Sequence, residues 1–444
     1  MSFPADTQTV DTLIEARWII PIEPANTVLD HHALVIHNQR IVDLLPIEQA
    51  RIRYQPRTSH QLNQHAVLPG LINLHTHAAM TLLRGYADDL PLMDWLKGHI
   101  WPAERRHASA DFVREGTRLA CAEMLRGGIT CFNDMYFFPA AAAETAIACG
   151  MRAMIGMIVI DIPTAYASDS TDYLNKGLSM RDHLSDEPLL NFAFAPHAPY
   201  TLDNHSFERL IALAEQLDVP IHMHLHETED EITQSLAKYG QRPLARLHAL
   251  GLTSPRLIAV HAVHLDADEQ RLLAEHGCHI AHCPASNLKL ASGIAPIAGL
   301  SARHINIGLG TDSAASNNTL DMFDAMRLAA LLAKGNTREA NTLPAHDVLA
   351  MATINGARAL GLDHDIGSLR PGKLADVIAV DLSQPETQPC YHPVTQLVYA
   401  ASRHAVSHVW VNGKLLLNER RFTQLDEDVI RRDAHIWHDK LLAS

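Results

Sequence analysis

The sequence predicts an α/β fold, a (β/α)₈ TIM-type barrel that carries a small β-sandwich domain formed from both termini. Two observations predict it. The middle of the chain, residues 67–366, alternates short apolar runs with amphipathic helical stretches, which is typical of parallel βα units. The ends, 1–66 and 367–444, instead alternate apolar and polar residues between tight polar turns. We therefore expect the barrel to be inserted between two halves of one β domain.

The terminal β domain is predicted from strand patterns at both ends. Residues 33–37 and 40–45 form a candidate hairpin around a two-residue polar turn. Near the other end, 373–380 and 406–415 alternate in the same way, and Asn412-Gly413 supplies a turn that favours a hairpin. Strands from opposite ends of the chain would then share one sheet.

Eight apolar segments in the middle are the candidate barrel strands. A helix, 110–126, lies between the first two, and Gly127-Gly128 is expected to end it. Eight strands in about 300 residues fit a TIM-type barrel with long loops. A doubly wound open sheet is the alternative, but no G-x-G-x-x-G follows the first strand. The segments are 71–75, 129–134, 151–156, 191–197, 220–226, 257–261, 278–282 and 306–312.

Charge and composition exclude several classes of partner. A formal net charge of −14 disfavours binding to nucleic acids or anionic membranes. The most apolar stretch, 140–162, is interrupted by Glu144 and Arg152 and is not expected to span a membrane. The start of the chain has no basic-then-apolar signal pattern, so we expect a cytoplasmic protein. None of the six cysteines forms a C-x-x-C pair, and we expect free buried thiols.

Residues that can bind a metal stand at the ends of five predicted strands. In a (β/α)₈ barrel the carboxyl ends of all strands meet at one mouth, so these residues become neighbours. An H-x-H pair can arise by chance among 29 histidines, and an Asp after Gly-Thr can cap a helix. The combination is much harder to explain by chance. The residues are His75 and His77 on the first strand, His197, His224, His261 and Asp312.

Four of these residues form a nitrogen-rich set, namely His75, His77, His224 and Asp312. Such a set suits one Zn²⁺ per subunit, with water completing its coordination. Zinc lowers the pKa of a bound water, and a carboxyl group must then move the proton released. Glu227 follows His224 by three residues and is placed for that work, although a solvated surface acid is the ordinary alternative.

The motifs around these residues resemble those of the amidohydrolase superfamily, and within it the methylthioadenosine/S-adenosylhomocysteine deaminases. The motifs are PGLINLHTH at 69–77, HLHE at 224–227, HAVHL at 261–265 and GTDSAASNN at 310–318. The resemblance covers nearly the whole chain and includes GSLRPGKLAD at 367–376. It implies a zinc-dependent hydrolytic deaminase of adenosine-type nucleosides that releases ammonia, and possible assembly into a homo-oligomer.

The resemblance also implies a role for each site residue. Glu227 would carry the proton to the purine ring nitrogen, and Asp312 would accept the proton of the attacking water while also ligating zinc. His261 would hydrogen-bond that water. His197 would contact the substrate, and Glu104 would hold the ribose hydroxyls, since one carboxylate can accept two hydrogen bonds from a vicinal diol.

One segment departs from the family pattern, and other functions remain open. Residues 160–176 contain no arginine to meet a homocysteine tail, which favours methylthioadenosine. A free heterocycle such as guanine, a pterin or a triazine is the alternative substrate, with Glu104 as the discriminating residue. A binuclear hydantoinase-like site would need a lysine within 191–197, which has none. A non-catalytic barrel used for protein interaction is the remote alternative.

Several polar residues near the predicted mouth receive no assigned role. His226 shares the strand of His224 and is expected to be a neutral core residue rather than a support for the metal ligands. His264, His282 and Asn287 belong to motifs of the mouth without a task that the sequence defines.

Overall fold

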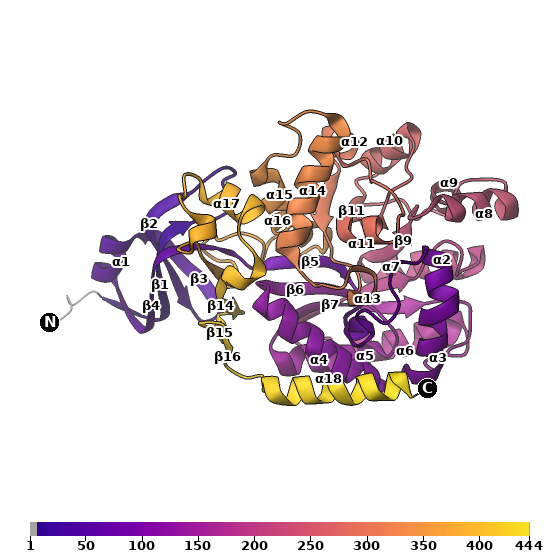
Figure 1. The fold of residues 1–444 in the computed structure, drawn as a ribbon, viewed down its shortest axis with the longest axis horizontal. Helices are drawn as coiled ribbons and strands as arrows, with labels where there is room; N and C mark the ends of the chain where they lie inside the picture. Colours follow the sequence, from indigo (N-terminus) through magenta and orange to yellow (C-terminus); the bar gives the residue numbers. More distant parts are fainter. Residues whose placement is uncertain (1–6, 444) are drawn as a thin grey trace.

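The computed structural model describes residues 7–443, and two eight-stranded sheets organise it (Figure 1). Residues 1–6 and 444, which the sequence analysis assigns to the terminal domain, lie outside the described residues. One sheet is the barrel, and the other combines strands from both ends of the chain. This arrangement confirms the predicted fold class.

The barrel strands pair in sequence order, each parallel to the next. Backbone contacts join the last strand region to the first, since the N–H of Asp312 donates to the carbonyl of His75 at 2.9 Å. All eight predicted segments are strands. They are β5 (Leu71–Thr76), β6 (Ile129–Met135), β7 (Arg152–Val159), β8 (Leu190–Pro196), β9 (Ile221–Leu225), β10 (Leu257–His261), β11 (His279–His282) and β12 (Asn306–Leu309).

The predicted strand limits are wrong at several carboxyl ends. β12 ends at Leu309 rather than at 312, and β9 ends at Leu225 rather than at 226. Asp312 and His226 have φ angles of 61° and 53°, in the left-handed region, so the backbone has left the extended conformation at these residues. These side chains therefore project from turns that immediately follow the strands.

Helices surround the barrel strands (Figure 1). The predicted helix 110–126 is α4, whose N-terminal Ser109 accepts a hydrogen bond from the N–H of Phe112, and Gly128 follows it with φ 80°. The α-helices that follow β5, the first barrel strand, within the barrel part of the chain are α2 (Leu92–Trp95), α3 (Trp101–His107), α4 (Ala110–Arg126), α5 (Pro139–Cys149), α6 (Ser170–His183), α7 (Asn204–Leu217), α8 (Glu229–Tyr239), α9 (Pro243–Ala249), α10 (Ala267–Glu275), α11 (Pro284–Lys289), α12 (Ile297–Ala302), α13 (Ala314–Asn317), α14 (Met322–Thr337), α15 (Ala345–Met351) and α16 (Ile354–Ala359).

Four short helical turns and three further helices complete the described elements. A 3₁₀ turn and a π turn lie between β5 and α3, in the segment that covers the barrel mouth. The C-terminal helix runs along α4 below the barrel in Figure 1, and its Trp437 ring contacts Phe112 edge-on at 5.3 Å. These elements are α1 (Ile47–Arg53), α17 (Pro393–Tyr399), α18 (Glu427–Leu442), η1 (Ala78–Leu83), η2 (Leu96–Ile100), η3 (Pro385–Thr387) and η4 (Arg403–Ala405).

The terminal sheet has the strand order β16-β15-β14-β13-β4-β1-β2-β3, so both ends of the chain build it. Its two halves meet where the N–H of Ala375 donates to Gln39 at 2.8 Å and the N–H of Gly413 donates to Ala375 at 2.9 Å. The sheet therefore folds over a shared apolar core, which includes Ile14 and Trp410. Its strands are β1 (Gln8–Ile19), β2 (Leu29–His37), β3 (Arg40–Pro46), β4 (Tyr54–Pro69), β13 (Val377–Asp381), β14 (Val406–Val411), β15 (Lys414–Asn418) and β16 (Arg421–Phe422).

Two further expectations can be compared with the structure. All six cysteines are free, and Cys390 alone among them is partly exposed. Within residues 7–443, no helix has the length and apolar character needed to cross a membrane. The domain limits at 66 and 367 stay a prediction.

One buried ion pair ties the barrel to the terminal sheet. The guanidinium of Arg152, at the start of β7, donates to both carboxylate oxygens of Asp376 at 2.8 and 3.1 Å. The side chains are only 4% and 2% exposed. Asp376 also accepts from the backbone N–H of Asn412 at 2.8 Å, so both of its carboxylate oxygens are hydrogen-bonded. Removing one partner would leave the other charge buried and uncompensated.

We predict that Arg152→Met lowers the free energy of unfolding by about 3–5 kcal/mol, because Asp376 would lose its buried counter-charge. Urea denaturation followed by circular dichroism measures the change. Arg271→Met is the matched control, because its ion pair with Asp268 is 60% and 82% exposed, and an exposed pair contributes about 0–1 kcal/mol. Equal effects of the two substitutions would contradict the prediction.

Candidate metal and catalytic site

Three predicted ligands bring imidazole nitrogens to one point at the barrel mouth. The Nε2 atoms of His75 and His77 each lie 3.3 Å from Oδ1 of Asp312. The ring of His224 lies 4.9 Å from that of His75 and 5.3 Å from that of His77. The structure therefore brings together all four residues that the sequence predicts as ligands.

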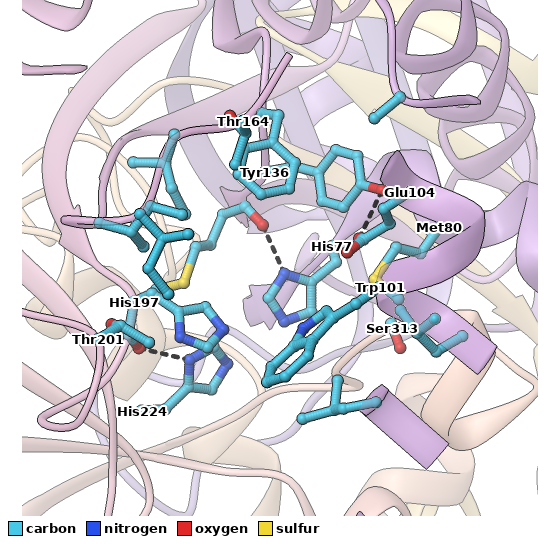
Figure 2. A pocket seen from close by; sticks show the side chains of 18 of the residues that line it. His77, Met80, Trp101, Glu104, Tyr136, Thr164, His197, Thr201, His224 and Ser313 are labelled. Atoms are coloured by element: carbon cyan, nitrogen blue, oxygen red, sulfur yellow. Dashed lines mark hydrogen bonds between the residues drawn. The ribbon is translucent and has the colours of Figure 1, made fainter. Parts of the chain in front are cut away.

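Hydrogen bonds hold the outward nitrogen of each imidazole. Such contacts fix the ring orientation and the tautomer of metal-binding histidines. The His77 and His224 Nδ1–H groups point at carbonyl oxygens, so in the neutral rings the lone pairs sit on Nε2 and face the centre. The partners are the His222 ring for His75 (2.8 Å), the Met135 carbonyl for His77 (2.5 Å, Figure 2) and the His197 carbonyl for His224 (2.7 Å).

Asp312 is the anionic member of the cluster. Its Oδ2 accepts hydrogen bonds from the hydroxyls of Ser286 at 2.6 Å and Ser316 at 2.9 Å. Its Oδ1 accepts from the N–H of Ser313 at 2.7 Å. Burial acts to raise the pKa of Asp312, but the adjacent imidazoles outweigh it and hold this pKa well below its usual range. The carboxylate is therefore ionised at neutral pH.

The donor set fits a divalent cation. Burial lowers the pKa of His75 to about 4 and holds that of His224 well below its usual range, so both rings are neutral. The Nε2 atom of His77 lies 3.3 Å from a carboxylate oxygen, and the Nε2 atom of neutral His75 is buried without a hydrogen-bond partner. Electron pairs facing one another in a buried site need a cation between them, and an N/O donor set of this kind suits zinc.

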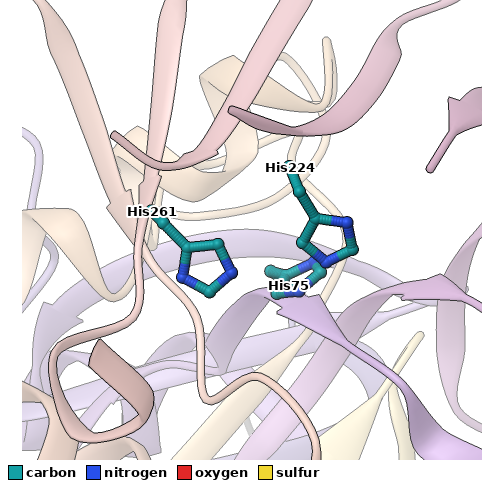
Figure 3. A group of neighbouring side chains, drawn as sticks. All are labelled: His75, His224 and His261. Carbon is teal, nitrogen blue, oxygen red and sulfur yellow. The ribbon is translucent and has the colours of Figure 1, made fainter. Parts of the chain in front are cut away.

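His261 belongs to the same cluster. Its ring stacks on that of His224 at 5.5 Å, and ligand atoms of His75, His224 and His261 lie within 4.8 Å of one another (Figure 3). The Oδ1 atom of Asn287 lies 2.8 Å from His261 Nδ1 and accepts a hydrogen bond from it. The other ring nitrogen of His261, Nε2, faces Glu227. Asn287, which has no role from sequence alone, thus orients His261.

Glu227 lies beside His261, with 3.7 Å between Oε2 and Nε2. The residue is only 7% exposed, so it is not a solvated surface acid. Glu231, in the first turn of α8, accepts hydrogen bonds from the N–H groups of His226 at 2.9 Å and Glu227 at 3.0 Å. Burial raises the pKa of Glu227. A positioned carboxyl group with a raised pKa is suited to proton transfer near neutral pH.

A cavity of about 370 Å³ opens over this cluster, and its lining includes His77, His224, Glu227, His261 and Asp312. Much of the remaining wall is apolar. It is formed by aromatic and aliphatic side chains, which include Leu92, Trp95, Trp101, Tyr136, Phe138, Ile160, Ile162 and Tyr166. Pockets of this size and character hold small molecules that combine a flat apolar body with a few polar groups.

Glu104 and His197 also line the cavity (Figure 2). Glu104 lies on α3, and the hydroxyl of Tyr136 donates to its Oε1 at 2.8 Å. Burial raises the pKa of Glu104 to about 7, although the hydrogen bond from Tyr136 opposes the shift. Burial lowers the pKa of His197 to about 3, and its Nδ1 has no hydrogen-bond partner. Both side chains are thus available to a ligand.

Two of the remaining histidines, His226 and His264, hold the loops around the site. His226 accepts from the N–H of Leu244 at 3.1 Å, and its other ring nitrogen lies 3.2 Å from the His264 carbonyl. His264 in turn lies 2.7 Å from the carbonyl of Ser292. His226 is therefore a buried structural residue, as expected. His282 is buried and Nδ1 lacks a partner, and burial lowers its pKa to about 3.

Sequence reasoning missed residues that act through the predicted ones. Ser316 lies inside the motif at 310–318, whereas Ser286 lies outside every quoted motif and 26 residues before Asp312, so its contact with Asp312 forms only in the folded chain. Met135, which acts through its carbonyl, and Tyr136, which acts through its hydroxyl, lie outside every quoted sequence motif. Only their position at the end of β6, where barrel strands meet the mouth, could have indicated them.

Comparison with known proteins places this site in a family. The family model described as the amidohydrolase family matches residues 66–416. A 5-methylthioadenosine/S-adenosylhomocysteine deaminase of Teredinibacter turnerae is 47% identical and covers 98% of this chain and 99% of its own length. A protein of the same name from Saccharophagus degradans is 46% identical, with 98% of this chain and 97% of its own length covered.

Solved structures agree with the family match. An adenosine deaminase of Xanthomonas campestris with bound zinc has a TM-score of 0.98 and 49% identity, and covers 99% of this chain and 100% of its own. An atrazine chlorohydrolase of Arthrobacter aurescens complexed with zinc has a TM-score of 0.89 and 25% identity, with 96% and 99% covered. The motifs, the barrel, the metal-donor cluster and these matches lead to one conclusion: the chain belongs to the amidohydrolase family.

Proposed function

We propose that this protein is a zinc-dependent hydrolytic deaminase of adenosine-type nucleosides, which replaces the exocyclic amino group of the purine with oxygen and releases ammonia. 5′-Methylthioadenosine and S-adenosylhomocysteine, named for its relatives, are the proposed substrates, together with adenosine. The observation that carries the proposal is that one cavity holds both the metal-donor cluster and a carboxylate, Glu104, suited to a ribose.

His75, His77, His224 and Asp312 are the proposed ligands of one zinc per chain. When bound there, zinc supplies a Lewis acid that makes hydroxide available near neutral pH. The neutral state of His75 and His224 and the ionised state of Asp312 match what metal ligation requires. Ser286 and Ser316 keep Asp312 fixed through two hydroxyl donors.

Three side chains of the cluster carry the proposed proton chemistry. Asp312 accepts one proton of the attacking water, whose orientation His261 supports through Nε2. Glu227 gives its proton to the purine ring nitrogen, which makes the ring carbon more electrophilic. As the carbon–nitrogen bond breaks, Asp312 passes its proton to the amino group, which leaves as ammonia, and the second proton of the former water returns to Glu227. Glu227 changes between its two protonation states easily because burial has raised its pKa.

Glu104 favours a nucleoside over a free heterocycle. Its carboxylate lies in the cavity with Oε2 free of protein donors among the described contacts, and a vicinal diol can donate to it. A free base such as guanine has no ribose to use this group, and the second oxygen of the half-buried carboxylate would then lack a partner. His197, with its unpartnered Nδ1 at the cavity wall, is the proposed second substrate contact.

The cavity wall favours an apolar 5′ substituent. The loop after β7 contributes Ile160, Ile162 and Pro163, and its Asp161 is not among the lining residues. Among the described lining residues, Arg105 is the only arginine or lysine, and it is exposed. A methylthio group would therefore bury its surface against this loop, which favours methylthioadenosine. Assembly into a homo-oligomer and a cytoplasmic location stay predictions.

The substrate proposal predicts that the enzyme releases ammonia from methylthioadenosine. The kcat/KM for methylthioadenosine should exceed that for S-adenosylhomocysteine, because the loop after β7 offers apolar contacts and no buried counter-charge for the charged homocysteine tail. Coupled ammonia assays on zinc-loaded enzyme with methylthioadenosine, S-adenosylhomocysteine, adenosine and guanine measure it, and chloride release is measured for a chlorotriazine. Turnover of guanine or the triazine, together with no turnover of any nucleoside, would contradict the proposal and favour a free heterocycle as the substrate.

Glu227→Gln is predicted to lower kcat by roughly 10²–10⁴-fold, the range typical of a proton-transfer group. Elemental analysis should still find one zinc per chain, because Glu227 is not among the four ligands. Glu229→Gln, an exposed acid two residues further along in the first turn of α8, is the matched control and should leave kcat unchanged. Full activity of the Glu227 variant would remove this residue from the mechanism.

Glu104 predicts a pH dependence of nucleoside binding. Its raised pKa of about 7 means that the carboxylate, which accepts the ribose hydrogen bonds, is lost as pH falls through neutrality. KM for adenosine should therefore rise as the pH falls from about 8 to about 6. Glu104→Gln should show a higher KM that lacks this slope. A variant that keeps the wild-type slope would show that another group titrates.

A further inference from the structure

We infer that Tyr136 is a specificity-determining residue for the ribose, which acts by holding the Glu104 carboxylate where the vicinal diol binds. The inference rests on the proposed nucleoside deaminase function and extends it to a residue outside every motif of the sequence analysis. It is carried by the position of Tyr136 at the end of β6 and by its contact with Glu104.

Two consecutive residues at the end of β6 serve two different parts of the site. The carbonyl of Met135 accepts the Nδ1–H of His77 and so orients a proposed metal ligand. The hydroxyl of Tyr136, the next residue, donates to Oε1 of Glu104 at 2.8 Å. Figure 2 shows both hydrogen bonds on the same wall of the cavity. The spacing between the reaction centre and the ribose carboxylate is therefore set by one strand end.

Glu104 needs such a support because its own segment is not part of the sheet. It lies on α3, a helix of seven residues that follows the π turn η2 and belongs to the long excursion between β5 and α4. A glutamate has three side-chain torsions, and ordering them on substrate binding would cost affinity. The hydrogen bond from Tyr136 orders the carboxylate before the substrate arrives.

The phenol of Tyr136 is itself fixed by its neighbours. Tyr136 is 4% exposed, and its ring lies 6.4 Å from that of Phe112 on α4 and 5.4 Å from that of Phe137. Phe112 in turn contacts Trp437 of the C-terminal helix α18 edge-on. Aromatic side chains packed in this way have little freedom, so the hydroxyl is a rigid donor.

The contact leaves Glu104 able to bind the sugar. An ionised carboxylate offers about four acceptor positions, of which the tyrosine hydroxyl takes one. The second oxygen remains for the hydroxyls of a ribose. Without the Tyr136 hydroxyl, the Glu104 carboxylate could rotate away from the ribose site. The entropic cost of ordering it would then reduce the affinity for the substrate. The chemistry at the metal-donor cluster would not change.

The test is Tyr136→Phe, which removes the hydroxyl and keeps the packed ring. Steady-state kinetics of the zinc-loaded enzyme with adenosine should give a KM that rises about tenfold, since a hydrogen bond to a charged group is at stake, while kcat changes less than about twofold. With 2′,3′-dideoxyadenosine, which lacks both hydroxyls, the same substitution should leave KM unchanged. In a Glu104→Gln background it should have no additional effect on KM.

Tyr54→Phe is the matched control, because that buried tyrosine also donates to a carboxylate, Asp43, at 2.9 Å, but in the terminal sheet. It should leave both kinetic constants unchanged. Unchanged KM for adenosine in Tyr136→Phe would overturn the inference, as would an equal increase for the dideoxy substrate. A wild-type enzyme inactive on every nucleoside would instead overturn the proposed function, and the inference with it.

Discussion

The whole site depends on one electrostatic constraint, the confinement of imidazole lone pairs and a carboxylate in a buried space. Neutral His75 and His224 and the ring of His77 converge on the ionised Asp312, and all of them except the 12% exposed His77 are buried. In a low-dielectric site such an arrangement is stable only with a cation at its centre. Hydrogen bonds hold these groups in place against their mutual repulsion. The Ser286 hydroxyl, for example, donates to Asp312, and the Met135 carbonyl accepts from His77.

The barrel topology satisfies that constraint because it brings distant residues to one mouth. The functional side chains lie at the last residues of the strands, as His75, His224 and His261 do, or in the turns that follow, as Asp312 does. His261 and Asp312 adopt φ angles of 70° and 61°, where the backbone leaves the extended conformation. The rigid parallel sheet thus ends in short turns whose unusual backbone aims each side chain at the centre, and the packed barrel supports those turns.

The sequence predicts most of the fold and the four ligands because both leave local signals. Apolar runs with period-two or helical spacing locate all eight strands and α4, and strand-end histidines locate the cluster. Hydrogen-bond partners leave no such signal. The contact between His261 and Asn287, or between Glu104 and Tyr136, is decided by loops that become neighbours only in the folded chain. The strand limits fail at Asp312 for a similar reason, since a left-handed turn has no unique residue pattern.

The division between predictable and unpredictable residues also separates two kinds of function. The donor cluster and Glu227 sit on the strand ends, where the shared barrel holds them, and one fold can apply such a centre to many substrates. Selection among substrates falls to the excursion that carries Glu104 and to the loop after β7, neither of which the sheet orders directly. Tyr136 couples these two regions, because the strand end that orients His77 also orients the carboxylate facing the sugar. Recognition and chemistry are therefore placed relative to each other by the backbone of a single strand.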